Sequence, residues 1–161
     1  MQPVSQSLEN KLINAARQEK INRFVVGAII FRKHAASAEI LILKRNRSDF
    51  FGGIDELPSG KVEKNESLAV ALYRETKEET NLEISQIYGY LQYFDYASRR
   101  GDKTRQFNFV VAIKDSPVKV DPKEHYGFAW VAIENLSKTK LTDNVINLIF
   151  SNQDQLIKQI S

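Results

Sequence analysis

The sequence predicts one α/β domain in which helices pack against a mixed β-sheet. Apolar, β-branched segments of strand length recur along the chain and are separated by turn residues. A stretch without Gly or Pro, rich in Leu, Ala, Glu and Lys, marks a central helix. The chain has 161 residues and no repeat or flexible linker, so we expect residues 1–161 to form a single domain.

The first 20 residues are expected to form a helical extension of that domain. Leu8, Leu12 and Ala16 recur at helical spacing between Ser7 and Lys20. This pattern predicts a short amphipathic helix that packs on the body of the protein or on a partner.

Five later segments have the length and composition of strands. His34–Ala38 and Ser48–Gly53 are expected to be loops, and Leu57–Gly60 is expected to be a turn. A polar hairpin, Ser98–Thr104, is expected to join the two longest strands. The expected strands are Arg23–Phe31, Glu39–Arg45, Ile84–Tyr96, Arg105–Ile113 and Phe128–Ala132.

Two more helices complete the prediction. Ser67–Thr80 has the clearest helical pattern in the chain. Thr142 is expected to cap a last helix that runs to about Ile160.

The composition excludes several classes of protein. The chain has no cysteine, which excludes disulfides and thiolate chemistry. No apolar run approaches the roughly 20 residues of a membrane span, and the N-terminus lacks a signal-peptide core, so we expect a cytoplasmic protein. The net charge of +3 is too balanced to indicate a nucleic-acid polymer as partner, but it suits a small anionic substrate.

The central helix carries three carboxylates, Glu75, Glu78 and Glu79, at positions that share one helix face. Like charges at these spacings mildly destabilise a helix, so helix stability does not account for them. A hard divalent cation, Mg²⁺ or Mn²⁺, would account for them. The alternative is a solvated acidic face that balances nearby lysines.

The residues before these acids favour the metal interpretation, because the whole stretch resembles the Nudix box. That motif is glycine, five residues, glutamate, seven residues, Arg-Glu, an apolar residue, any residue, Glu-Glu, any residue, glycine and an apolar residue. Three positions depart from its commonest form, namely Thr76 and Asn81 within the motif and Ser59 directly before it. The matching residues are Gly60, Glu66, Arg74, Glu75, Glu78, Glu79 and the apolar Leu82.

The resemblance implies a Nudix-type α/β/α sandwich and a role for each matching residue. Glu75 and Glu79 would bind Mg²⁺, which Mn²⁺ can replace, and Glu78 would belong to the same cluster. The main-chain carbonyl of Ser59 would complete the protein ligands. Arg74 would orient the glutamates, with Gly60 and Glu66 supporting the site.

Four residues outside the box are further candidates. Relatives often carry a glutamate shortly before a tryptophan-containing strand, and here Glu124 precedes Trp130. Glu124 is therefore a candidate metal ligand or general base, although Glu75 and Glu78 remain alternatives for the base; His125 is interpreted as its loop neighbour. Arg45, Tyr96 and Asn144 are candidate substrate-binding residues, and each has a purely structural alternative.

The resemblance implies a pyrophosphohydrolase that acts on a small-molecule nucleotide. A nucleoside triphosphate, including an oxidised one, is the first expectation, with a nucleoside monophosphate and pyrophosphate as products. Dinucleoside polyphosphates and ADP-sugars are the alternatives within this class. A nucleotide-binding regulatory module without catalysis is the alternative from another class. A homodimer is one option for its assembly.

Overall fold

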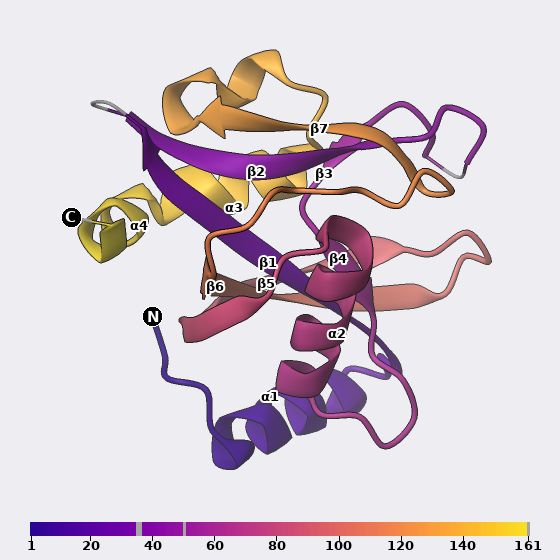
Figure 1. Cartoon of the computed structure of the whole chain (residues 1–161). Helices are drawn as coiled ribbons and strands as arrows, with labels where there is room; N and C mark the ends of the chain where they lie inside the picture. Colours follow the sequence, from indigo (N-terminus) through magenta and orange to yellow (C-terminus); the bar gives the residue numbers. More distant parts are fainter. Residues whose placement is uncertain (35–36, 50, 161) are drawn as a thin grey trace.

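The computed structural model describes residues 1–34, 37–49 and 51–160. A mixed sheet forms the middle of the molecule, with helices on both of its faces (Figure 1). Helices α1 (Gln6–Gln18) and α2 (Leu68–Thr80) pack on one face, and α3 (Asp143–Ser151) and α4 (Gln153–Ile160) pack on the other. This arrangement confirms the α/β/α sandwich.

The sheet is mixed because β1 has neighbours of both orientations. It pairs in parallel with β6 and antiparallel with β2 and β4. The strand order is β3-β2-β1-β6-β5, with β4 added on β1 and β7 on β2. The strands are β1 (Arg23–His34), β2 (Ser37–Arg45), β3 (Asp55–Glu56), β4 (Ser59–Lys61), β5 (Ile84–Ala97), β6 (Lys103–Ile113) and β7 (His125–Ala132).

Alternation along β1 divides the core into two layers. Val26, Ala28 and Ile30 face α1 and α2, whereas Ile29 and Phe31 face α3 and α4. Successive side chains of a strand point to opposite faces, so a strand that is apolar throughout must lie between two covered faces. A short 3-10 helix, η1 (Ile133–Lys138), joins β7 to the C-terminal helices. Among the described residues, no helix is long and apolar enough to cross a membrane.

The structure corrects several of the expected elements. The loop expected at His34–Ala38 is shorter, because His34 ends β1 and Ser37 begins β2; Ala35 and Ala36 lie outside the described residues. The turn expected at Leu57–Gly60 ends in β4, where Gly60 pairs with Val26.

The last helix expected from Thr142 to about Ile160 is divided into α3 and α4. Thr142 is the N-cap residue of α3, but the side chain of Thr142 makes no capping hydrogen bond. The helix is interrupted at Asn152, whose side-chain amide donates to the Leu148 carbonyl oxygen at 2.8 Å. A side chain that satisfies a terminal carbonyl in this way favours the end of a helix.

Candidate active site

Helix α2 carries the acidic face, and side chains from two parts of the chain cap its N-terminus. The Ser67 hydroxyl accepts a hydrogen bond from the Val70 amide at 3.1 Å. The buried carboxylate of Glu9, from α1, accepts bonds from the Leu68 and Ala69 amides at 2.8 and 3.2 Å. Negative charge is favourable at a helix N-terminus, so α1 stabilises the start of α2. Glu75, Glu78 and Glu79 lie in the last two turns.

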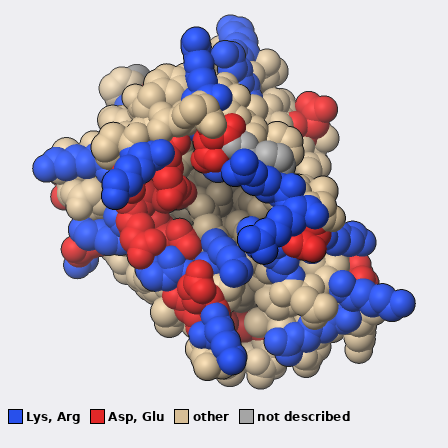
Figure 2. Space-filling model, turned by 90° about the vertical axis from the view of Figure 1, so that its right-hand side faces the viewer, with Lys and Arg blue, Asp and Glu red and all other residues tan. Residues whose placement is uncertain are grey.

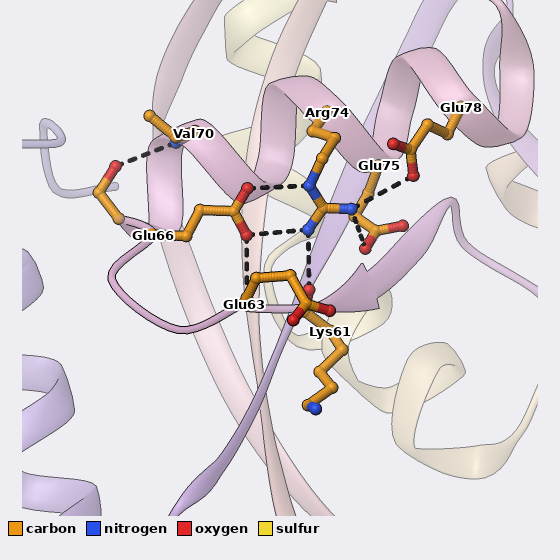
Figure 3. Close-up of polar contacts among 8 residues, drawn as sticks. Lys61, Glu63, Glu66, Val70, Arg74, Glu75 and Glu78 are labelled. Carbon is orange, nitrogen blue, oxygen red and sulfur yellow. Dashed lines mark hydrogen bonds and ion pairs between the residues drawn. The ribbon is translucent and has the colours of Figure 1, made fainter.

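Arg74 organises the outer part of this face (Figure 3). Its guanidinium donates two hydrogen bonds to Glu66, both 2.8 Å long, and one to the Lys61 carbonyl oxygen. The remaining nitrogen donates to Glu75 at 2.6 Å and to Glu78 at 3.2 Å. The bond from Arg74 lowers the pKa of Glu66. The bidentate hydrogen bonds to Glu66 fix the guanidinium plane, so Arg74 can orient Glu75 and Glu78.

Glu79 lies deeper than its neighbours. The residue is 7% exposed, and its carboxylate accepts a hydrogen bond from the Ser59 amide at 2.7 Å. Burial raises the pKa of Glu79 well above its usual value, and nearby acids, including Glu56 and Glu124, add to that shift. Burial also raises the pKa of Glu75. Carboxylates that repel one another in a poorly solvated place favour a bound cation, so this group is suited to hold a divalent metal.

Glu124 and His125 come to Glu79 from a distant part of the chain. Each of these three residues offers a ligand atom, and the three atoms lie within 4.8 Å of one another. The main chain of Glu124 is held by the Asn46 amide, which donates to its carbonyl oxygen at 2.9 Å. Treating His125 as a loop neighbour was wrong, because it begins β7 and is completely buried.

A cavity of about 560 Å³ is lined in part by Ser59, whose amide donates to Glu79, and by Gly60, which lies against the carboxyl group of Glu75. Figure 2 shows this face of the molecule, with acidic side chains gathered on the left of a central hollow and basic ones on its right. Arg45, Tyr96 and Asn144, the three candidate substrate-binding residues, all line the cavity. The structure thus places them together beside Ser59 and Gly60. The lining also includes the basic and aromatic residues Arg23, Lys61, Phe94 and Arg99 and the acidic residues Asp49, Asp55 and Glu56.

Glu56 is a residue of this region that sequence reasoning missed. It accepts hydrogen bonds from Arg45 at 3.1 and 3.3 Å, and His125 Nε2 lies 2.7 Å from it. Glu56 belongs to the two-residue strand β3, which is too short to be recognised from its own pattern. Its position just before Leu57-Pro58 was the only signal in the sequence.

Comparison with known proteins identifies the family. The family model of the NUDIX domain matches residues 21–150. The chain belongs to the Nudix family. It is 31% identical over 120 residues to the asymmetrical bis(5'-nucleosyl)-tetraphosphatase of Mus musculus, covering 67% of this chain and 78% of the mouse protein. The chain is thus a Nudix hydrolase, an enzyme that acts on phosphoanhydrides.

Solved structures share the Nudix fold. The Ap4A hydrolase of C. elegans in a binary complex superposes with a TM-score of 0.73 and 22% identity, over 85% of this chain and 99% of that one. The MutT Nudix hydrolase of Burkholderia pseudomallei superposes with a TM-score of 0.67 and 25% identity, over 78% of this chain and 95% of that one.

Each of the three departures from the Nudix box has a defined place in the structure. Asn81 has φ 61°, the left-handed conformation that Asn tolerates better than most residues, and it ends α2. Thr76 is 1% exposed and takes the apolar position. Ser59 lies in β4 and meets Glu79 through its main-chain amide.

Proposed function

We propose that this Nudix hydrolase depends on a divalent cation and cleaves dinucleoside polyphosphates, with nucleoside triphosphates as the second candidate class. One observation carries the proposal. Ser59 and Gly60, which contact Glu79 and Glu75 of the acidic group, line a cavity whose wall carries basic, aromatic and acidic side chains. Such a cavity suits a polyphosphate that ends in a nucleobase.

The acidic group fits Mg²⁺ or Mn²⁺, since both prefer oxygen ligands. We propose Glu75, Glu79 and the Ser59 carbonyl as ligands, with Glu78 in the same cluster. A bound cation would neutralise charge on the phosphate oxygens and make its water more acidic.

The chain's own residues would do the remaining work. Arg74 keeps Glu75 and Glu78 in position through its bonds to both. Glu75, Glu78 and Glu124 are the acids that could take the proton of the attacking water. Arg45, which is already directed by Glu56, would meet a phosphate at the cavity wall. Tyr96 would stack on a base, and Asn144 would contact it from the start of α3.

The relatives change the order of the substrate candidates. A nucleoside triphosphate was the first expectation from sequence. The mouse relative is named for bis(5'-nucleosyl)-tetraphosphates, and the C. elegans protein is named an Ap4A hydrolase. These names favour a dinucleoside polyphosphate, whereas similarity to MutT proteins keeps nucleoside triphosphates as the second candidate.

A substrate screen tests this proposal. Diadenosine tetraphosphate, ATP, dGTP and ADP-ribose are each incubated with Mg²⁺, Mn²⁺ or excess EDTA, and the products are separated by chromatography. We expect diadenosine tetraphosphate to give the highest kcat/KM and EDTA to abolish turnover. A higher kcat/KM for a triphosphate would overturn the substrate class alone. Full turnover in EDTA would overturn the metal requirement, and binding of nucleotides without any turnover would favour the regulatory-module alternative.

A further inference from the structure

Of the two ring nitrogens of His125, only one has a hydrogen-bond partner among the described residues. Its side chain is 0% exposed. Nε2 lies 2.7 Å from a carboxylate oxygen of Glu56. Nδ1 is buried, and among the described residues it has no hydrogen-bond partner. A buried polar atom without a partner is costly, so it calls for an explanation.

The bond to Glu56 determines what Nδ1 can do. An ionised carboxylate only accepts hydrogen bonds, so Nε2 carries the proton and donates it. In the neutral ring, Nδ1 then carries a lone pair directed away from Glu56. A metal-binding histidine usually donates one ring N–H to a carboxylate and binds the metal through its other ring nitrogen.

The surroundings of His125 supply the other ligands. Glu79 and Glu124 each place a carboxylate oxygen within 4.8 Å of a ring nitrogen of His125. Glu79 is buried and Glu124 is exposed, so the group reaches from the interior to solvent. Two carboxylates and a ring lone pair are all ligands that a cation can share. A cation between them would satisfy all three at once.

We propose that His125 supplies a nitrogen ligand to a cation position formed with Glu79 and Glu124, and that this position prefers Mn²⁺ or another imidazole-binding transition metal to Mg²⁺. Imidazole suits transition metals, whereas Mg²⁺ prefers oxygen ligands only. The inference rests on the metal dependence proposed above and adds a ligand from outside the Nudix box.

Electron spin-echo envelope modulation of the Mn²⁺-loaded full chain, without nucleotide, tests the inference directly. A coordinated nitrogen modulates the Mn²⁺ echo, and oxygen ligands do not produce that signal. We expect nitrogen modulation in the parent protein and in His34→Gln, which changes the exposed histidine of β1. We expect the modulation to disappear in His125→Gln, whose side-chain amide can keep the bond to Glu56.

Calorimetric titration with Mn²⁺ and Mg²⁺ on the same proteins gives the second measurement. We expect His125→Gln to weaken Mn²⁺ binding about tenfold or more. Mg²⁺ binding should weaken much less. Circular dichroism establishes whether His125→Gln is folded. If the variant is unfolded, the presence or absence of nitrogen modulation in the parent protein still tests the role of His125. Mn²⁺ binding without nitrogen modulation would overturn the role of His125 and leave the proposed hydrolase intact, whereas absence of any Mn²⁺ binding would overturn both.

Discussion

The carboxyl group of Glu75 occupies the space that a side chain on Gly60 would need. A β-carbon built on Gly60 would overlap the carboxyl carbon and both oxygens of Glu75. The end of a glutamate side chain can move away at little cost to the fold, but the candidate metal ligand would then be displaced.

Gly60→Ala should therefore reduce activity far more than stability. We expect kcat to fall about 100-fold, because small displacements of reacting groups are costly in catalysis. The thermal unfolding midpoint should change little. Gly127→Ala is the matched control, since the nearest atom to its added β-carbon would be Lys44 Cδ at 3.8 Å. Equal activity of both variants would show that Glu75 need not occupy this place.

Glu79→Gln should stabilise the cation-free protein at neutral pH while abolishing most turnover. Burial raises the pKa of Glu79, so its ionised form is disfavoured in the folded state and the neutral amide avoids that penalty. The amide oxygen can still accept the Ser59 bond. Thermal melts with and without Mn²⁺ check this, and Mn²⁺ should stabilise the parent more than the variant. Near-normal turnover would indicate that Glu79 is not a metal ligand.

Asn81→Gly should be tolerated, whereas Asn81→Val should destabilise the protein by about 1–2 kcal/mol. The site has φ 61°, which a β-branched residue adopts poorly. Fraying there would also move Glu78 and Glu79, so kcat of the Val variant should fall. Chemical denaturation measures the stability. Asn147→Val, at an exposed helical position of α3, is the control and should change little.

Glu9→Gln should weaken the start of α2 and lower stability by about 0.5–2 kcal/mol, the usual range for a helix cap. Glu9 is 4% exposed and accepts hydrogen bonds from two amides of α2. Removing its charge therefore weakens its interaction with the N-terminus of α2. Denaturant titration gives the value, with exposed Glu63→Gln as control. Identical unfolding midpoints for the two variants would argue against the cap.

Glu19→Gln should lower stability at neutral pH but not in acid. The hydrogen bond from Arg105 lowers the pKa of Glu19 below its usual 4.5. A group with a lowered pKa stabilises the fold above its unfolded value, and that contribution is lost as pH falls through the folded pKa. The stability difference between parent and variant should therefore be constant well above the usual pKa of 4.5 and shrink as the pH falls through the lower folded pKa. A difference that persists in acid would mean that the charge of Glu19 is not the cause.

The sequence by itself determined α2 and the face it presents. Helix periodicity, the Ser67 cap and the left-handed Asn81 are local properties, and each is readable from neighbouring residues. The same holds for β1 and β2, each of which contains a continuous apolar run. The spacing of Glu75, Glu78 and Glu79 therefore predicted a shared face before any contact was known.

Only the tertiary structure decided which distant residues reach that face. Glu124 and His125 meet Glu79 because β7 pairs with β2, and Glu56 joins them because β3 pairs with the same strand. Likewise, Glu9 reaches α2 across 59 residues of sequence. Sheet pairing and helix docking bring together residues that no local pattern connects, because register and packing depend on the whole core.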